Sequence, residues 1–382
     1  MEKLPKKLQS KIDQRKAENA LRALTFKGEL VDFSSNDYLG FARSEDISKR
    51  ASYLIKEVTP INGATGSRLL TGNHKLYGQL EDFLTEHYGS ESALVFNSGY
   101  DANIGFFSSV PQRGDVVLYD ELAHASIRDG IQMGHAKSFK FSHNDIDHLK
   151  ERILSLRAQS SNESEIYVVT ESVFSMDGDS PNLESMAMLC REQNCFLVVD
   201  EAHATGIFGQ GRDMVSQLGL QKEVFARLIT FGKAIGCHGA AVLGSPSLKE
   251  YLINFSRSFI YTTALSPHSL ATVLAAHQYL KEQGEPVIQT LQENIGFFKS
   301  EATRLQLSEK FIQSNSAIHC ALVIGNSNVK YMAQQLQSHG FDVKPILSPT
   351  VKEGEERLRF CLHAFNSKEE ISRVLSLLKN LM

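Results

Sequence analysis

The stretch TFGKAIGCHGAAVLG, residues 230–244, contains a single lysine among small and apolar residues. For fifteen residues after Lys233, the only side chain that can carry a charge is His238, and only when it is protonated. Lysines rarely occur in such surroundings, because burying an ammonium group without a partner costs free energy. Lys233 is therefore a candidate for a reactive amine, which can act as a nucleophile or carry a proton.

A carboxylate and an imidazole follow another apolar segment. CFLVV at 195–199 is typical of a buried strand, and DEAHATG with Asp200 and His203 comes directly after it. Lys233 follows the similar segment at 227–231. Alone, Asp200 could cap a turn and His203 could be a buried structural histidine. Together at neighbouring strand ends, where open α/β sheets bind their ligands, the three side chains indicate a reactive site.

Pyridoxal phosphate requires such a set of residues. It needs a lysine amine for its Schiff base and a carboxylate that keeps its pyridine nitrogen protonated, so that the ring can absorb the electrons of a Cα carbanion. It also needs an anion site. NSGYDAN at 97–103 lies between an expected strand and an expected helix, so the backbone N–H groups of Gly99 and Tyr100 are expected to face a phosphate. The hydroxyl of Thr230 would add a further contact.

The elements that must position these residues alternate between short apolar segments and helical patterns. Segments such as 145–158 and 182–193 repeat their apolar residues every three or four positions, which is typical of helices. The expected strands are 92–96, 116–119, 166–170, 195–199, 227–231 and 240–244. This alternation predicts an α/β domain with a mostly parallel sheet that is covered on both faces.

The pattern changes near residue 280. The segment 285–306 is expected to form a long amphipathic helix, and the strands that follow have a more polar face. Ser367 is the candidate N-cap of a final helix. We expect residues 1–45 to form an N-terminal helix and arm that packs with the C-terminal domain. Residues 46–280 would form the large cofactor-binding domain, and residues 281–382 a smaller α+β domain.

These motifs resemble those of the α-oxoamine synthases, which are pyridoxal-phosphate enzymes of the aspartate-aminotransferase fold, also called fold type I. Their order and spacing carry the resemblance over nearly the whole chain. The further matching strings are LVDFSSNDYLGF, GATGSRLLTGNHKLYGQLE, DELAHASIRDG, TESVFSMDGDSPNL, VVDEAHATGIFGQGR and SPTVKEGEERLRF.

The resemblance implies a role for each matching position. Lys233 would form the Schiff base and move the Cα proton, and Asp200 would pair with the pyridine nitrogen. His203 would donate to the ring's 3-oxygen, and His124 would stack on the ring and contact the substrate. The remaining implied cofactor contacts are Gly99, Tyr100, Ser175 and Thr230, together with Thr262 or Thr263, which would reach the phosphate bound in the partner subunit of a homodimer.

The resemblance also implies substrate contacts. Arg359 would hold the amino-acid carboxylate through a bidentate pair, and Arg22 and Thr350 would contact the acyl group. Other interpretations stay open at this stage. Arg359 alternates with apolar neighbours and could lie on the exposed face of a strand. Arg22 lies on a charged helix, and Glu171 is expected to support the site rather than react.

The implied reaction condenses an amino acid with an acyl thioester of coenzyme A or of a carrier protein, with loss of carbon dioxide. The strings FSSNDYLG and SPTV favour the member of the family that joins L-alanine to a pimeloyl group. Members that use glycine or serine are the alternatives, because these substrates differ by one or two heavy atoms. Cys237 and His238 occupy positions where small residues are usual.

Composition limits the other function classes. The net charge of −4 argues against a nucleic-acid partner, and no apolar segment is long enough for a membrane span. The five cysteines form no C-x-x-C pair, and the start of the chain has no apolar signal segment, so we expect a cytoplasmic protein. No metal is expected, because Asp145 in HNDIDH is better placed to cap a helix.

Two further classes stay open. The first is a pyridoxal-phosphate enzyme of sulfur or amino transfer. A desulfurase should have its catalytic cysteine in a mobile loop, whereas the cysteines here lie in or beside expected elements. The second is a binding protein without catalysis, which would not require Lys233, Asp200 and His203 together.

Overall fold

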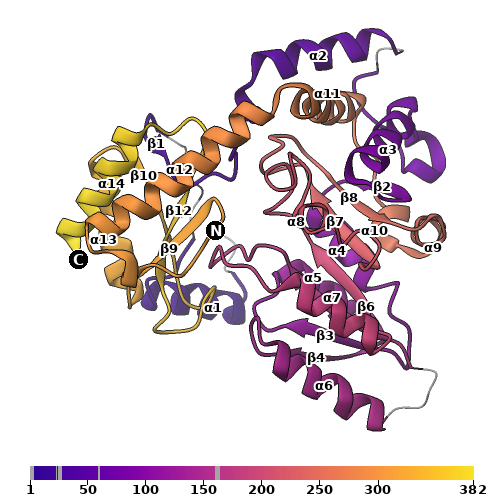
Figure 1. Ribbon diagram of the computed structural model, residues 1–382, viewed down its shortest axis with the longest axis horizontal. Coiled ribbons are helices and arrows are strands. Elements are labelled where there is room, and N and C mark those ends of the chain that lie inside the picture. The colour runs from indigo at the N-terminus through magenta and orange to yellow at the C-terminus, as the bar shows by residue number, and fades with distance from the viewer. Residues whose placement is uncertain (1–3, 23, 25–27, 59–60, 160–163) are drawn as a thin grey trace. The chain divides into compact units, whose positions relative to one another are not determined.

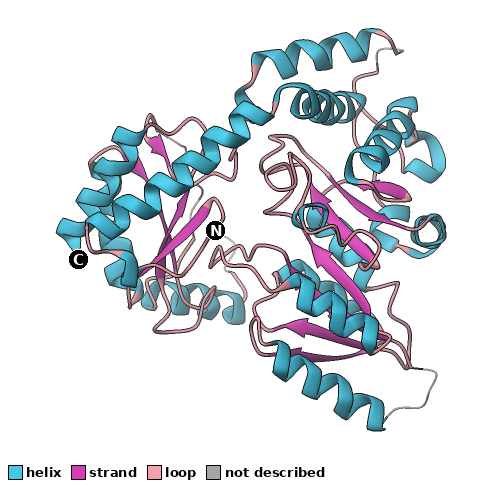
Figure 2. Ribbon diagram, viewed as in Figure 1, coloured by secondary structure: helices cyan, strands magenta, loops and turns pink. Residues whose placement is uncertain are grey.

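The computed structural model describes residues 4–22, 24, 28–58, 61–159 and 164–382. The chain divides into two compact units (Figures 1 and 2). The larger unit comprises Asn36–Ser175 and Ser180–Gln289, and the smaller comprises Met1–Ser35, Met176–Asp179 and Thr290–Met382.

The larger unit is built on a seven-stranded sheet with the strand order β2-β8-β7-β6-β5-β3-β4. Its strands are β2 (Ser92–Phe96), β3 (Val116–Asp120), β4 (Lys137–Phe141), β5 (Ile166–Glu171), β6 (Phe196–Asp200), β7 (Ala226–Thr230) and β8 (Ala240–Gly244). β8 runs antiparallel to β2 and β7, and the other neighbouring pairs are parallel. The expected mostly parallel sheet is therefore confirmed, and β4 is the strand that the sequence pattern missed.

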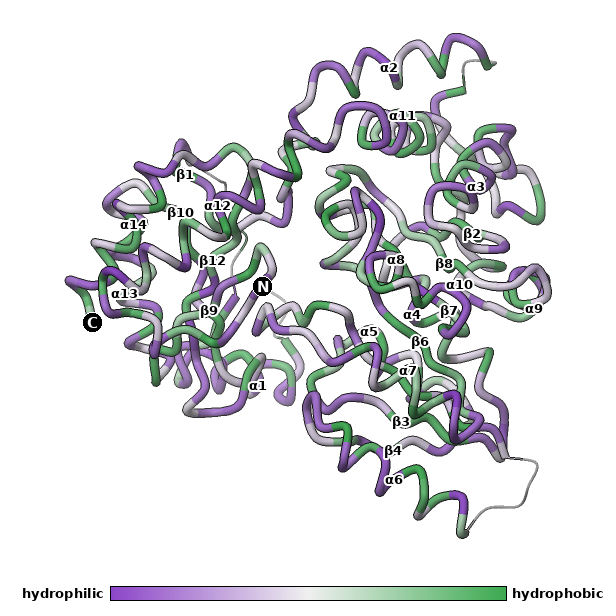
Figure 3. The backbone as a smooth tube through the Cα atoms, in the orientation of Figure 1, coloured by the Kyte–Doolittle hydropathy of each residue, from purple (hydrophilic) through white to green (hydrophobic). Residues whose placement is uncertain are grey.

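The sheet is buried on both faces because successive side chains of a strand point to opposite sides. Val117 and Val198 belong to one hydrophobic core, and their neighbours Val116 and Val199 belong to the other. Residues of α4 (Gly99–Phe107), α5 (Ala125–Met133), α9 (Pro246–Phe255) and α10 (Arg257–Ile260) complete the first core. Residues of α6 (Ile146–Gln159), α7 (Leu183–Glu192) and α8 (Met214–Gln217) complete the second. Figure 3 shows the hydrophobic colour concentrated along these strands.

Three further helices of the larger unit are α2 (Glu45–Lys56), α3 (Lys75–Tyr88) and α11 (Pro267–Gln283). Helix starts follow the expected capping chemistry. The Asp145 carboxylate accepts a hydrogen bond from the backbone N–H of His148 at 2.9 Å, at the start of α6. Among the described residues, no helix combines the length and the apolar character needed to cross a membrane.

The smaller unit contains a three-stranded antiparallel sheet and a short parallel pair of strands. The first has the order β11-β12-β9, and the second joins β1 to β10. These strands are β1 (Val31–Asp32), β9 (Ile318–Leu322), β10 (Phe341–Asp342), β11 (Lys344–Ile346) and β12 (Arg357–Cys361). The helices are α1 (Lys6–Ala17), α12 (Glu285–Arg304), which starts within the range of the larger unit, α13 (Asn326–Ser338) and α14 (Lys368–Leu381). Ser367 caps α14 through a capping box with Glu370, as expected.

Candidate active site

A cavity of about 260 Å³ lies at the carboxyl ends of the parallel strands in the larger unit. This volume is close to the lower end of the range, roughly 300 Å³ upward, that is typical of small-molecule sites. The sequence-predicted residues that line the cavity are Gly99, Tyr100, His124, Asp200, Thr230 and Lys233. The fold thus brings together residues that are more than 130 positions apart in the chain.

Asp200 is the last residue of β6 and is buried. One carboxylate oxygen, Oδ1, accepts a hydrogen bond from the backbone N–H of Ala202 at 2.9 Å. The other, Oδ2, accepts one from the side-chain amide of Asn103 on α4 at 2.8 Å. Two donors hold the orientation of the carboxylate.

His203 lies three residues beyond Asp200 and is also buried. Its Nδ1 nitrogen lies 2.7 Å from the hydroxyl oxygen of Tyr38, and that hydroxyl is also 3.1 Å from Oδ1 of Asn36. Tyr38 is fully buried, so this contact fixes the ring orientation of His203.

Glu171 ends the neighbouring strand β5, where it is paired in register with Asp200. One of its oxygens accepts a hydrogen bond from the backbone N–H of His124 at 2.6 Å. Burial raises the pKa of Glu171 to about 8, with a further contribution from the Asp200 carboxylate and an opposing one from Lys233. Glu171 therefore holds its proton at neutral pH.

His124 is the N-cap residue of α5, and its side chain faces the cavity. The reduced hydration inside the cavity lowers the pKa of His124. Asp200 opposes this shift, and the positive charge of Lys233 adds to it. The imidazole is therefore neutral at neutral pH.

Lys233 lies in the segment that joins β7 to β8. The turn around it is closed by two backbone hydrogen bonds, from Gly236 N–H to the Lys233 carbonyl at 2.8 Å and from Cys237 N–H to the Phe231 carbonyl at 2.7 Å. Gly236 has a φ of +67°, and a Cβ there would collide with the backbone of Ala42. Glycine is therefore required at this position for the turn that presents Lys233.

The N-terminus of α4 forms the remaining wall of the cavity. Ser98 caps this helix, because its hydroxyl accepts a hydrogen bond from Asp101 N–H at 3.0 Å. A Cβ on Gly99 would lie 2.7 Å from Cγ2 of Thr230, so only glycine lets the helix start approach the end of β7 this closely. Free N–H groups at such a helix start attract anions.

Other sequence-predicted residues lie outside this cavity lining. Ser175 lies in the segment after β5. The side-chain amide of Asn97 donates to the Thr262 hydroxyl at 3.1 Å and to the Thr263 carbonyl at 2.6 Å. His203 follows the lining residue Asp200 by three positions and is not itself part of the lining. The roles proposed for these side chains stay predictions.

The smaller unit holds three of the four residues predicted to contact substrate, namely Arg22, Thr350 and Arg359, whereas His124 belongs to the larger unit. Nη2 of Arg22 lies 3.5 Å from the hydroxyl oxygen of Thr350, so these two residues are neighbours. Arg359 is in the central strand β12 and is 8% exposed, which excludes the exposed-face interpretation.

Sequence reasoning missed several residues of the site. Asp200 is bonded by Asn103, and His124 is bonded by Ser126. The hydroxyl of Tyr38 contacts both His203 and Asn36. The available signal was their position inside the motifs SGYDANIG, DELAHASIRDG and FSSNDYLG, although nothing in the strings shows which groups their side chains contact.

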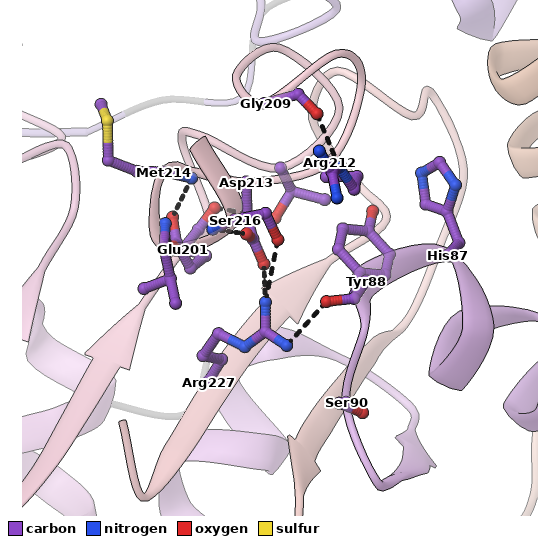
Figure 4. A network of polar contacts seen from close by, with 12 residues as sticks. His87, Tyr88, Ser90, Glu201, Gly209, Arg212, Asp213, Met214, Ser216 and Arg227 are labelled. Atoms are coloured by element: carbon purple, nitrogen blue, oxygen red, sulfur yellow. Dashed lines mark hydrogen bonds and ion pairs between the residues drawn. The ribbon is translucent and has the colours of Figure 1, made fainter. Parts of the chain in front are cut away.

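A buried polar network holds the segment that follows Asp200 (Figure 4). Glu201 accepts hydrogen bonds from the backbone N–H groups of Met214 and Val215 at 3.2 and 2.8 Å. Arg227 on β7 pairs with the Asp213 carboxylate at 2.7 Å and donates to the Tyr88 carbonyl at 2.9 Å. The loop between β6 and α8 is thereby tied to the strand that leads to Lys233.

The chain is similar to known proteins over most of its length. The model of the family described as aminotransferase class I and II matches residues 28–378. An 8-amino-7-oxononanoate synthase of Emericella nidulans is 38% identical over 366 residues, which cover 90% of this chain and 87% of the relative. A putative 8-amino-7-oxononanoate synthase of Methanococcus vannielii is 36% identical and covers 95% of both chains.

Solved structures are similar over almost the whole chain. A serine palmitoyltransferase from S. paucimobilis with a bound PLP-myriocin aldimine has a TM-score of 0.88 at 25% identity, covering 98% of this chain and 96% of the other. An 8-amino-7-oxononanoate synthase from Francisella tularensis has a TM-score of 0.77 at 26% identity, covering 92% and 97%. The expected fold is confirmed by these similarities.

Proposed function

The chain belongs to the aminotransferase class I and II family, and on this premise we propose that it is a pyridoxal-phosphate-dependent acyltransferase. It condenses L-alanine with a pimeloyl thioester of coenzyme A or a carrier protein, releasing carbon dioxide and 8-amino-7-oxononanoate for biotin synthesis. The observation that carries the proposal is the cavity lined by Lys233, Asp200 and His124. It occurs in a chain of which relatives named 8-amino-7-oxononanoate synthase match about nine-tenths.

The cavity residues fit pyridoxal phosphate in chemical type. Lys233 would hold the aldehyde carbon covalently, and the oriented carboxylate of Asp200 would pair with the pyridine nitrogen. The N–H groups at the start of α4 and the hydroxyl of Thr230 would hold the phosphate, in a space that a Cβ at Gly99 would fill. When bound, the cofactor supplies an electron sink for the charge that develops at the substrate Cα.

The remaining chemistry belongs to this chain's own side chains. The Nζ amine of Lys233 would take the proton from the substrate Cα. The neutral imidazole of His124 would lie against the cofactor ring and contact the substrate. His203 would donate to the ring's 3-oxygen, and Ser175 would be a further cofactor contact. His124 is the N-cap of α5, and Lys233 lies three residues beyond the end of β7. Positions so close to regular elements favour precise placement.

The substrate contacts complete the proposal. Arg359 would hold the α-carboxylate of L-alanine through its planar guanidinium group. Arg22, with the Thr350 hydroxyl beside it, would contact the acyl group, whose distal end in pimelate is a second carboxylate.

We also propose a cytoplasmic homodimer with shared active sites. Thr262 and Thr263 are held by Asn97 and do not contribute to the cavity lining of their own chain. A hydroxyl from this segment would therefore serve the phosphate bound by a second copy.

The second candidate is another α-oxoamine synthase, acting on serine or glycine. The observation in its favour is the TM-score of 0.88 to serine palmitoyltransferase, which exceeds the 0.77 to 8-amino-7-oxononanoate synthase. The higher sequence identity of the relatives named 8-amino-7-oxononanoate synthase, 36–38%, supports the first candidate more strongly.

A substrate panel tests the choice. The holoenzyme is incubated with alanine, glycine or serine and with pimeloyl-, acetyl- or palmitoyl-CoA, and the free thiol is measured. We expect the highest kcat/KM for L-alanine with pimeloyl-CoA. Thiol release with glycine and acetyl-CoA, and none with alanine and pimeloyl-CoA, would contradict the proposed substrates.

A further inference from the structure

A chain of hydrogen bonds joins two residues of the proposed site through two that the sequence analysis did not single out. The side-chain nitrogen of Asn103 lies 2.8 Å from Oδ2 of Asp200 and 3.0 Å from the hydroxyl oxygen of Ser126. That hydroxyl lies 2.7 Å from Nδ1 of His124. Asn103 and Ser126 are 3% and 1% exposed, so water does not compete for these groups.

The direction of each bond follows from the chemistry of the groups. An amide nitrogen donates two hydrogens and accepts none, so Asn103 donates to both Asp200 and Ser126. The reverse orientation of the amide would place its oxygen against the Asp200 carboxylate, which is repulsive. The Ser126 oxygen therefore accepts from Asn103, and its own hydrogen is available for Nδ1 of His124.

A second donor points to the same ring nitrogen. The backbone N–H of Ser126 donates to Nδ1 of His124 at 3.3 Å, as expected for an N-cap side chain. A backbone N–H can only donate, so Nδ1 must accept and has no proton. In the neutral imidazole the hydrogen is then on Nε2.

We propose that Asn103 and Ser126 are positioning residues that hold His124 as the Nε2–H tautomer and align it with the Asp200 carboxylate. The inference rests on the proposed function and deepens it. His124 then offers a hydrogen-bond donor, and not an acceptor, to whatever lies in the cavity. The partner it fits is an acceptor oxygen, such as the carboxylate or carbonyl oxygen of the substrate.

If Asn103 and Ser126 served only to cap α5, fewer hydrogen bonds would be needed than the structure contains. Capping of α5 needs only the bond from the backbone N–H of Ser126, which any residue at this position retains. The hydroxyl of Ser126 and the amide of Asn103 add three further bonds, which lead from His124 to Asp200 and not to the helix. The lowered pKa of His124 agrees with a neutral ring.

The first test is the tautomer itself, measured without cofactor. Protein labelled with ¹⁵N-histidine is studied by long-range ¹H–¹⁵N correlation, and the His124 signals are identified by their loss in His124→Gln. We expect an unprotonated Nδ1 and a protonated Nε2 in the unmodified chain. A protonated Nδ1 in the folded protein would overturn the proposal, whatever reaction the enzyme catalyses.

The second test compares matched variants. Ser126→Ala keeps the backbone N–H donor to Nδ1 and removes the hydroxyl donor, so the preference of His124 for the Nε2–H tautomer should weaken. We expect kcat to fall about tenfold, the scale of one lost hydrogen bond, with little change in KM for the acyl thioester. Ser126→Thr retains the hydroxyl and should restore both the tautomer and kcat. Ser92→Ala removes a buried hydroxyl that bonds only to the carbonyls of Gly244 and Ser245 at the opposite end of β2, and should change neither.

The two tests separate this inference from the proposed function. If the substrate panel fails while His124 is the Nε2–H tautomer and depends on Ser126, the positioning role stands and the substrate assignment falls. If the panel succeeds and Ser126→Ala behaves like Ser92→Ala, the positioning role is overturned. Thermal unfolding of each variant shows that the compared proteins are folded.

Discussion

At the scale of single residues, the two neighbouring carboxyl groups of the site lie in different environments. Asp200 accepts hydrogen bonds from two donors, whereas Glu171 is fully buried, accepts one from His124, and has a pKa raised to about 8. Glu171 therefore holds its proton at neutral pH and supports His124 without adding negative charge to the cavity.

The raised pKa of Glu171 predicts how stability depends on pH. The folded state binds this proton more tightly than the unfolded state, so the stabilisation is complete below about pH 4.5 and is lost as the pH rises toward 8. We expect the cofactor-free protein to lose up to about 1.4 kcal/mol of unfolding free energy per pH unit in this range through this group.

Denaturant unfolding between pH 5 and pH 8 checks this prediction. Glu171→Gln retains an acceptor for His124 N–H and should give a flatter dependence on pH. Glu184→Gln makes the same substitution at an exposed position in the first turn of α7 and should leave the wild-type dependence. Equal slopes for all three proteins would show that Glu171 is ionised in the folded state.

At the scale of elements, the loop after β6 is held by the buried network of Figure 4. Arg227 and Asp213 are 3% and 0% exposed, and Glu201 has a pKa raised to about 8 by burial and by Asp213. This network joins β7, which leads to Lys233, to the loop that contains His203. The relative positions of the two side chains therefore depend on it.

Removal of the Arg227 guanidinium from this network is expected to lower the free energy of unfolding strongly. Arg227→Met leaves the Asp213 carboxylate buried without its partner, which typically costs about 3–5 kcal/mol of unfolding free energy. Lys49→Met breaks an exposed pair with Glu45 on α2 and should change it by less than about 1 kcal/mol. Denaturant unfolding measures the free energy of unfolding of both variants. If Arg227→Met lowers it as little as Lys49→Met does, Arg227 is not required to hold the loop.

The sequence predicted the elements that carry long apolar patterns and missed those that do not. Six of the seven strands of the large sheet are dense runs of mostly apolar residues. The missed strand β4 is KSFKF, whose side chains are mostly exposed at the sheet edge. Lys233 and Asp200 were predictable because Asp200 directly follows the expected strand 195–199 and Lys233 lies two residues beyond the expected strand 227–231. Asn103 and Ser126 were not, because their contact depends on how α4 packs against α5.

At the scale of the whole molecule, the division into residues 1–45, 46–280 and 281–382 stays a prediction, as does the homodimer. A shared site makes a specific prediction about mixed dimers. The homodimer that carries Lys233→Ala is expected to be inactive. The homodimer that carries both Thr262→Ala and Thr263→Ala is expected to be inactive too. The mixed dimer would contain one site with an intact lysine and an intact hydroxyl from its neighbour.

Co-expression of the two variants with different affinity tags tests this prediction. Random pairing at equal amounts should recover about a quarter of the wild-type activity, because half the dimers are mixed and each has one complete site. No recovery in purified mixed dimers would mean that the hydroxyl acts within its own chain.

The measurement that tests the central claim most directly is borohydride reduction of the protein incubated with pyridoxal phosphate, followed by peptide mass spectrometry. Borohydride converts an imine to a stable amine, so a cofactor bound to lysine remains on its peptide. We predict a visible absorbance band that the reduction removes, and a phosphopyridoxyl group on Lys233 that is absent from Lys233→Ala. A colourless protein without an adduct, or an adduct on a different lysine, would contradict the account.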